Sequence, residues 1–168
     1  YMMYMISHPG KKLLFMGGEI GQFIEWRDDR EVDWLLLSYE SHQLLQKFNA
    51  DLNHFYLKHS EFYERDDNWL GFEWINADDR DRSIFSFVRK SKNGKNNLLF
   101  VINFTPMARE DFRVGVPNEG TYTLLLNERC EEGTVYEAEP IPTDRMPYSI
   151  PLPLNAYGTA VIKFNYKK

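Results

Sequence analysis

Carboxylate side chains gather between residues 19 and 33, and they are the groups in this sequence best suited to acid–base or nucleophilic chemistry. Glu19 directly follows a Gly17-Gly18 turn, and Asp28, Asp29, Glu31 and Asp33 lie nearby in the sequence. Two carboxylates that work together as nucleophile and acid/base must be held at a fixed short separation, but nothing in the spacing fixes such a pair, and a run of charge is usually a solvated loop. We therefore assign no catalytic residue. Glu19 either serves a site or hydrogen-bonds the backbone N–H groups of its own turn.

The histidines and the glycine pair do not predict a metal or phosphate site. His54 and His59 lie five residues apart without nearby cysteines, and His8 and His42 are isolated, which is not the spacing of a zinc site. No Lys-Ser or Lys-Thr pair follows Gly17-Gly18 at the distance that a phosphate-binding loop requires. We therefore expect neither a metal ion nor an organic cofactor.

The residues before these carboxylates predict the elements that would position them. Pro9 and Gly10 should end a helix formed by the apolar residues 1–7. Leu13–Met16 is a short apolar run without polar alternation, which is typical of a strand buried on both faces of a parallel sheet. A helix, a buried strand and a polar loop at the strand's C-terminal end make one unit of an α/β barrel. The active-site face of such barrels lies at that end.

The stretch HPGKKLLFMGGEIGQFIEW closely resembles a segment of the bacterial 1,4-alpha-glucan (glycogen) branching enzymes, which belong to the alpha-amylase family. The resemblance covers nearly the whole chain, since it continues through VDWLLL, DLNHFYLKHSEFYE, GFEWINADDRDRSIFSFVRK, LLFVINFTPMAREDFRVGVPNEGTY and PYSIPLPLNAYGTAVIKF. It implies an α+β fragment in two parts. Residues 1–66 would be the final strand and helices of a (β/α)8 TIM barrel, and residues 67–168 an antiparallel all-β sandwich, the alpha-amylase C-terminal domain.

The resemblance also implies an activity for the parent protein. Branching enzymes transfer an α-1,4-glucan segment to a 6-hydroxyl and so form the α-1,6 branches of glycogen. In that family the nucleophilic Asp, the acid/base Glu and a third Asp follow the fourth, fifth and seventh barrel strands, and all three would lie upstream of Tyr1. We therefore expect the parent to be an enzyme and this chain alone to be inactive.

Four residues of the loop are candidate glucan-binding residues under this resemblance: Glu19, Gln22, Trp26 and Asp28. Aromatic rings can pack against the apolar faces of glucose units while keeping a wet edge. Trp26 would line a donor or acceptor groove, with Gln22 and Asp28 as hydrogen-bonding neighbours. The alternative for Trp26 is core packing against the last helix.

Three other aromatic positions allow both interpretations. For Trp34 we favour core packing against the last helix. Trp69, Phe72 and Trp74 could form a surface platform for sugar, but we expect them to pack the β-domain against that same helix.

Hydrophobic periodicity predicts the rest of the fold. Apolar residues at spacings of three and four predict a helix over Ser41–Lys58 with Ser41 as its N-cap. From Trp69 onward the period is two, and short segments separated by turns indicate a β-sandwich. Asn93-Gly94 predicts a hairpin and Leu98–Phe104 a central strand. Pro151 and Pro153 place their strand at an edge, and Cys130–Tyr148 should be a long loop.

Composition limits partners and location. The net charge of −5 argues against nucleic acid and anionic membranes as partners. The single cysteine, Cys130, excludes an internal disulfide and is compatible with the cytoplasm. No secretory pattern is visible at Tyr1, and no apolar run approaches the roughly 20 residues that span a bilayer.

The predicted barrel elements would expose apolar surface in this chain alone, so we expect self-association through residues 1–40 or poor order there. Two other functions remain open: a non-catalytic carbohydrate-binding or structural β-domain, and the tail of a related alpha-amylase-family hydrolase.

Overall fold

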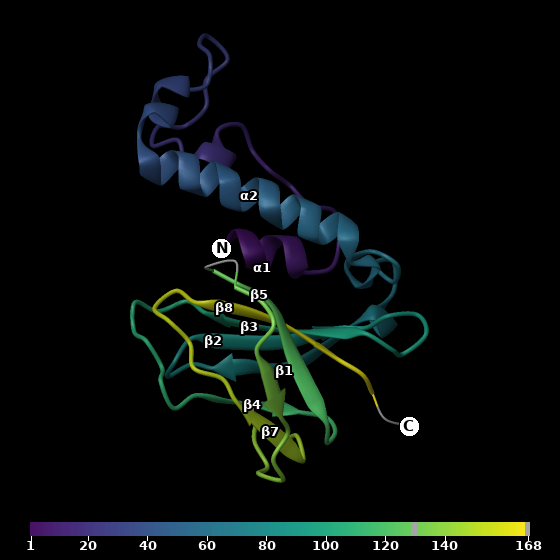
Figure 1. The fold of residues 1–168 in the computed structure, drawn as a ribbon. Helices are drawn as coiled ribbons and strands as arrows, with labels where there is room; N and C mark the ends of the chain where they lie inside the picture. The colour runs from purple at the N-terminus through teal and green to yellow at the C-terminus, as the bar shows by residue number, and fades with distance from the viewer. Residues whose placement is uncertain (129–130, 167–168) are drawn as a thin grey trace.

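A computed structural model describes residues 1–128 and 131–166, and in it a helical N-terminal part covers one face of an antiparallel β-domain (Figure 1). The helices are α1 (Met2–Ser7) and α2 (Glu40–Lys58), with the short 3-10 turns η1 (Gly18–Ile20), η2 (Trp34–Ser38), η3 (Ser60–Phe62) and η4 (Trp69–Gly71). The strands are β1 (Phe72–Asp79), β2 (Ile84–Arg89), β3 (Asn97–Asn103), β4 (Arg113–Val116), β5 (Thr121–Asn127), β6 (Val135–Glu137), β7 (Tyr148–Pro151) and β8 (Thr159–Phe164).

The strands form two sheets within the described residues. The larger sheet has the order β1-β2-β3-β8-β5-β6, and β4 pairs with β7 in a second, two-stranded sheet. Every pairing is antiparallel. Alternate residues of both sheets meet in one apolar core, to which β3 contributes Leu99 and Val101 and β4 contributes Val114 and Val116. The predicted antiparallel all-β fold is therefore confirmed.

Strand β3 is buried along its whole length because both faces of its sheet are covered. One face lies in the core between the sheets. The other face, with Leu98, Phe100 and Ile102, packs under Met3 and Ile6 of α1. The predicted central strand is thus confirmed, and so is the edge position of Pro151, which lies opposite Arg113 in the two-stranded sheet.

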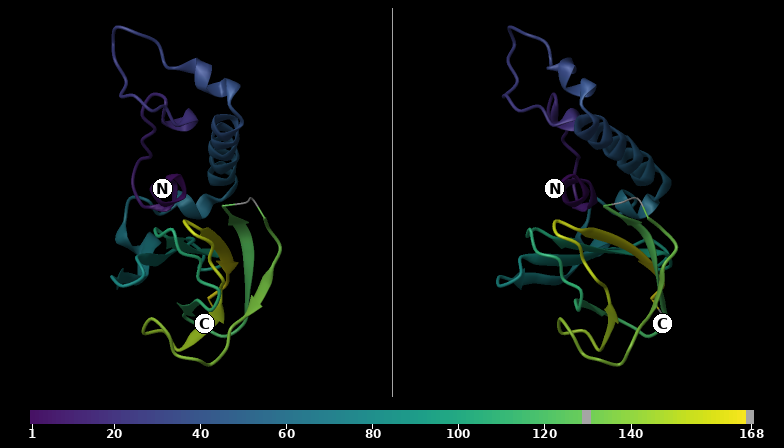
Figure 2. Two further views of the ribbon diagram at one scale, coloured as in Figure 1. Left: turned by 90° about the vertical axis from the view of Figure 1, so that its left-hand side faces the viewer. Right: turned by 60° about the vertical axis from the view of Figure 1, so that its left-hand side comes forward.

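Helix α1 lies between α2 and the sheet, turn η1 lies alongside α2, and the loop between η1 and η2 extends beyond the N-terminal end of α2 (Figures 1 and 2). Leu52 of α2 and Phe62 of η3 join α1 in the second apolar cluster. Both predicted helices are present. Their starts differ slightly, because α2 begins at Glu40 with Tyr39 at the N-cap, so Ser41 lies inside the helix and is not its cap.

The β-hairpin predicted at Asn93-Gly94 connects β2 and β3. Gly94 has φ +70°, a left-handed conformation that the turn requires and glycine adopts freely. The side-chain amide of Asn97 donates to the carbonyl of Gly94 at 3.0 Å. This turn fixes the register in which Arg89 lies opposite Leu98.

One β segment is irregular and another differs from expectation. Strand β1 extends to Asp79, and its pairing with β2 has register shifts between Trp74 and Asn76 and between Asn76 and Asp79. Residues 135–137 form β6 within the expected Cys130–Tyr148 loop and pair with β5. Cys130 itself lies outside the described residues.

The predicted strand Leu13–Met16 is wrong for this structure. Residues 11–15 have no regular secondary structure, and the exposed fractions of the four side chains lie between 46% and 72%. A strand of a parallel sheet needs hydrogen-bonding neighbours, and no described residue pairs with this segment. The barrel part of the predicted fold is therefore not seen.

Candidate glucan-binding loop and the junction with the β-domain

The loop after Phe15 is shaped by two left-handed glycines. Gly17 has φ +84° and Gly21 has φ +67°. A Cβ atom on Gly17 would lie 2.9 Å from the Cβ of Gln22, so the turn accommodates only glycine there. The N–H of Gln22 donates to the carbonyl of Gly17 at 3.0 Å, which closes the turn around η1.

Turn η1 is anchored on α2. Ile20 is fully buried, and its carbonyl lies 2.6 Å from Nδ1 of His42. The side-chain amide of Asn49 donates to the carbonyl of Glu19 at 3.0 Å. The contribution of Glu19 to this contact is thus its backbone carbonyl rather than its carboxylate.

Gln22 and Trp26 line one shallow hollow together with Phe15, Met16 and Phe23. The Trp26 ring packs edge-to-face against Phe15 with centroids 6.0 Å apart. Gln22 braces the loop, since its Oε1 accepts from the N–H of Asp33 at 2.9 Å and its Nε2 donates to the carbonyl of Ile24 at 2.9 Å. An aromatic wall with polar groups at its edge is chemically suited to one face of a sugar.

The four sequence-predicted residues therefore divide into two pairs. The structure brings Gln22 and Trp26 together, whereas Glu19 and Asp28 do not line this hollow. Asp28 is exposed in the turn beyond it. Phe15 and Met16, which were predicted to be buried strand residues, line the hollow instead. Their apolar run was visible in the sequence, but the exposure of that run was not.

The remaining tryptophans are more exposed than expected. Trp34 is 50% exposed at the start of η2, so it does not pack in a core. Trp69 is 83% exposed. Phe72 and Trp74 pack against the rings of His8 and Phe87, which places them at the end of α1 rather than on α2.

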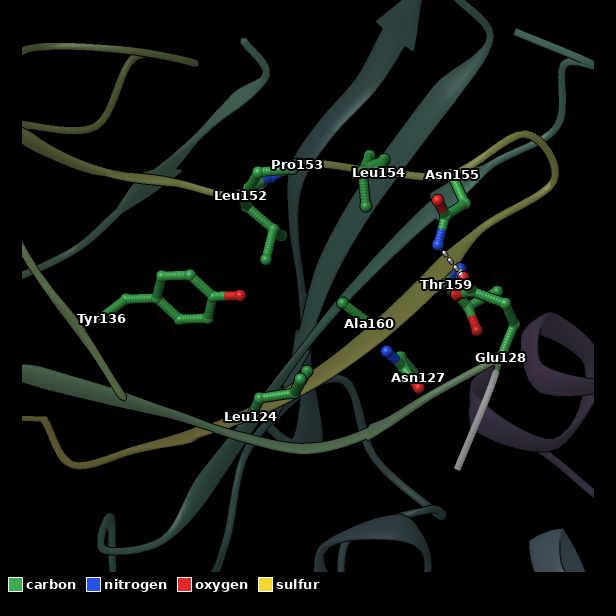
Figure 3. A pocket seen from close by; sticks show the side chains of 10 residues that line it. All are labelled: Leu124, Asn127, Glu128, Tyr136, Leu152, Pro153, Leu154, Asn155, Thr159 and Ala160. Carbon is green, nitrogen blue, oxygen red and sulfur yellow. Dashed lines mark hydrogen bonds between the residues drawn. The ribbon is translucent and has the colours of Figure 1, made fainter. Parts of the chain in front are cut away.

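A second hollow lies at the open end of the sandwich (Figure 3). The hydroxyl of Tyr136 points into it, and Glu128 at its rim accepts hydrogen bonds from the Asn155 side chain at 2.5 Å and from the Thr159 N–H at 3.0 Å. Its cavity volume is about 40 Å³. That is room for a water molecule or two and not for a glucose unit.

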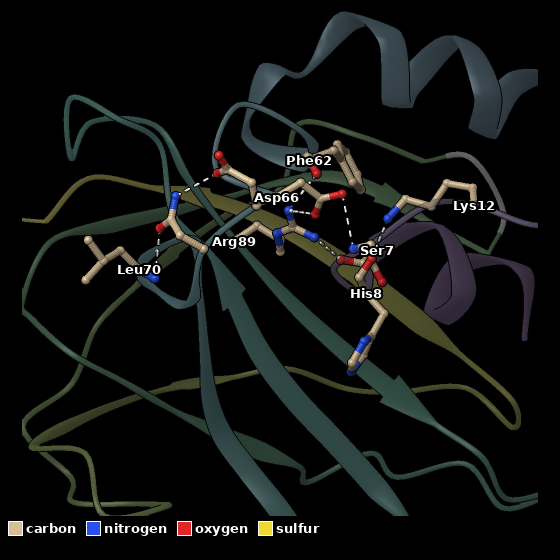
Figure 4. Close-up of polar contacts among 10 residues, drawn as sticks. Ser7, His8, Lys12, Phe62, Asp66, Leu70 and Arg89 are labelled. Atoms are coloured by element: carbon tan, nitrogen blue, oxygen red, sulfur yellow. Dashed lines mark hydrogen bonds and ion pairs between the residues drawn. The ribbon is translucent and has the colours of Figure 1, made fainter.

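Sequence reasoning missed Arg89, the charged residue that joins the helical part to the β-domain. Its side chain is fully buried at the end of β2, where it contacts Ser7, Phe62 and Asp66 (Figure 4). A single arginine at the end of an alternating strand gives no signal that it turns inward.

The charges at this junction shift the pKa values of their neighbours. Burial, reinforced by the cationic Arg89 and Lys12, lowers the pKa of His8 below its usual value. Burial also lowers the pKa of the Lys12 ammonium, against the opposing effect of the Asp66 carboxylate. His8 is therefore a neutral ring that packs among aromatic side chains near pH 7.

Two further properties concern the described residues only. In those parts of the chain, no three His, Cys, Asp or Glu side chains come together in a way that could hold a metal ion. No helix there is long and apolar enough to cross a membrane.

Comparison with known proteins identifies relatives of both parts of the chain. Residues 74–165 match the family described as the alpha amylase, C-terminal all-beta domain. The chain is 44% identical, over 98% of its length, to the 1,4-alpha-glucan branching enzyme GlgB of Butyrivibrio fibrisolvens. It is 42% identical, over 95% of its length, to the GlgB of Aquifex aeolicus. The chain spans 27% of the length of each of these curated relatives.

A solved structure shares the fold. A crystal structure of a MUTB point mutant, from crystals soaked with trehalulose, matches 80% of this chain and 21% of its own with a TM-score of 0.50 and 13% identity. With the family match and the high identity to GlgB proteins, the assignment follows. The chain belongs to the alpha-amylase C-terminal all-beta domain family and is homologous to the C-terminal portion of bacterial 1,4-alpha-glucan branching enzymes.

Proposed function

We propose that this chain is the C-terminal part of a cytoplasmic 1,4-alpha-glucan branching enzyme. The whole protein would transfer an α-1,4-glucan segment to a 6-hydroxyl and form an α-1,6 branch. The observation that carries the proposal is the 44% identity to a GlgB protein over 98% of this chain. Residues 1–66 would complete the catalytic barrel, and residues 67–168 would form the β-domain that braces it.

The exposed apolar side chains before α2 support this placement. Leu13 is 72% exposed and Phe23 is 83% exposed, and surfaces of this kind mark sites that another part of a protein covers. In the whole enzyme the remaining barrel would cover them. In this chain alone they would drive self-association through residues 1–40, so light scattering should detect dimers or larger species whose fraction rises with concentration. A monodisperse monomer at high concentration would contradict that part of the proposal.

The reaction would be a retaining double displacement, in which an Asp holds the cut glucan before the acceptor hydroxyl takes it. The catalytic carboxylates would come from outside this chain. The hollow at Gln22 and Trp26 would bind one glucan strand near the barrel mouth. Trp26→Ala in the longer protein should then raise the KM for amylose several-fold, and Asp28→Ala, which lies outside the hollow, serves as the matched control.

The activity test compares two proteins on amylose. The chain alone and the longer gene product that contains it are incubated with the substrate, and branch points are counted after debranching. Branches should form only with the longer protein. Branch formation by the chain alone would overturn the assignment, and release of small sugars by the longer protein would favour a related alpha-amylase-family hydrolase instead.

A second candidate function is glucan binding by the β-domain itself. The observation that favours it is an open hollow whose lining includes Trp69, Phe72 and Trp74. Maltoheptaose should then bind this chain in calorimetry, and Trp69→Ala or Trp74→Ala should weaken binding. Trp34→Ala, which removes a half-exposed ring elsewhere, should not. Undetectable binding to the unmodified chain would leave the β-domain a purely structural module.

A further inference from the structure

Arg89 holds together three segments that are far apart in the sequence. Its Nη1 donates to the carbonyl of Ser7 at 3.0 Å, at the end of α1. Its Nη2 donates to the carbonyl of Phe62 at 2.6 Å and to Oδ1 of Asp66 at 2.7 Å. The guanidinium therefore connects the end of α1, turn η3 and the following loop to strand β2 (Figure 4).

Asp66 extends this contact to the residues that leave α1. Its second oxygen, Oδ2, accepts from the N–H of Gly10 at 3.1 Å. Gly10 has φ +98°, so the chain turns sharply there. Lys12 also donates to the carbonyl of His8, which tightens the same turn. The ion pair of Arg89 and Asp66 thus holds both the last carbonyl of α1, on Ser7, and the backbone turn at Gly10 through which the chain leaves α1.

An arginine at this buried position indicates that the side chain is retained for its hydrogen bonds and not for filling space. The Arg89 side chain is 0% exposed, and its neighbours Phe87 and Val88 show that apolar residues fill this strand readily. A buried cation loses its hydration and is retained only where its partners are well placed. The fork of the guanidinium reaches several acceptors at once, which the single ammonium of lysine cannot do in the same geometry. Its Nε has no hydrogen-bond partner among the described residues, so the two terminal nitrogens make all of these contacts.

We propose that Arg89 and Asp66 are a positioning pair through which the β-domain sets the orientation of α1 and of the loop carrying Gln22 and Trp26. This inference rests on the proposed function, because that loop is the candidate glucan site. It places α1 in one cooperative unit with the β-domain, across the boundary at residues 66 and 67. Loss of the pair should release the Gly10 turn and the η3 loop together while the sheet stays folded.

Hydrogen exchange on this chain tests the coupling. Arg89→Lys and Asp66→Asn should each speed exchange at the Gly10 amide and over residues 60–66 by about tenfold or more, because charge-assisted hydrogen bonds are lost. Exchange in β3 and β8 should stay unchanged. Arg113→Lys is the matched control, since Arg113 also pairs with a carboxylate, Glu139, but in a half-exposed place. Faster exchange in only one of the two segments, or in neither, would overturn the proposal. If Arg89→Lys does not fold, Asp66→Asn decides, since it keeps the shape of the side chain.

Kinetics of the longer protein test the positioning role. Asp66→Asn should raise the KM for amylose several-fold and leave kcat nearly unchanged, because the loop would be misplaced while the catalytic groups remain. An unchanged KM alongside faster exchange would overturn the link to the glucan site. If the longer protein forms no branches, the proposed function fails, while the exchange result still tests the pair.

Discussion

Phe62 is the side chain whose removal should most clearly separate the helices from the sheet. It is fully buried, and its ring lies 5.4 Å from that of Phe100 in β3, 5.3 Å from Tyr56 and 5.8 Å from Phe55, all measured between centroids. Truncation of such a phenylalanine to alanine costs about 3–5 kcal/mol. Because three aromatic neighbours lose a partner at once, we expect Phe62→Ala to lower the free energy of unfolding by about 4 kcal/mol.

Urea unfolding followed by circular dichroism and by tryptophan fluorescence measures this loss. Phe62→Leu keeps most of the apolar volume and should cost about 1.5 kcal/mol or less. Tyr63→Ala is the control, because Tyr63 is the next residue, is 43% exposed, and should cost about 1 kcal/mol or less. A cost for Phe62→Ala no larger than that of Tyr63→Ala would show that η3 does not join the helices to the sheet.

Three further predictions concern protonation and close packing. Burial raises the pKa of Tyr122 to about 12. The neutral hydroxyl therefore stabilises the fold fully below pH ~10, and this contribution is lost as the pH rises toward about 12. Tyr122→Phe should flatten the fall in the free energy of unfolding, measured with urea, across this interval. Burial also raises the pKa of Glu61, so the ionised carboxylate opposes folding at pH values above the usual pKa of a glutamate. Glu61→Gln should therefore raise the free energy of unfolding at pH 7. In urea titrations below pH ~4 this gain should vanish. A Cβ on Gly115 would lie 2.2 Å from the carbonyl oxygen of Thr143. Gly115→Ala should therefore lower the free energy of unfolding, measured by thermal denaturation, by about 2 kcal/mol or more. Gly18→Ala is the control, because a Cβ there meets only ordinary contacts and the substitution should be nearly neutral.

The β-domain was predictable from the sequence because its signals are local. Strict alternation, Asn93-Gly94 and the prolines each act within a few residues, and each agrees with the final sheet. The order of the strands was not predictable in this way. The neighbours of β3 are set by how the two sheets pack around their common core, and the local sequence of a single strand does not determine that packing.

The N-terminal part was harder to predict, for a different reason. The pattern of Leu13–Met16 describes a strand only in the presence of neighbouring strands, since a backbone ladder needs a second chain segment. The exposure of Trp34 and the inward turn of Arg89 are likewise tertiary effects. At the candidate site, the sequence singled out Gln22 and Trp26, which line one hollow, and their role in binding glucan stays a prediction. It could not show that Glu19 would use its carbonyl to hold α2.

The strand order has a consequence for synthesis on the ribosome. Strand β8 ends at Phe164 and yet lies between β3 and β5 in the middle of the large sheet. It also supplies Val161 to the cluster that buries Met3 of α1. Helix α1 and the central strands are therefore covered only after β8 has been translated. Such long-range closure is slow and leaves apolar surface open in the meantime, so nascent chains of this domain should depend on chaperones until β8 has left the ribosome.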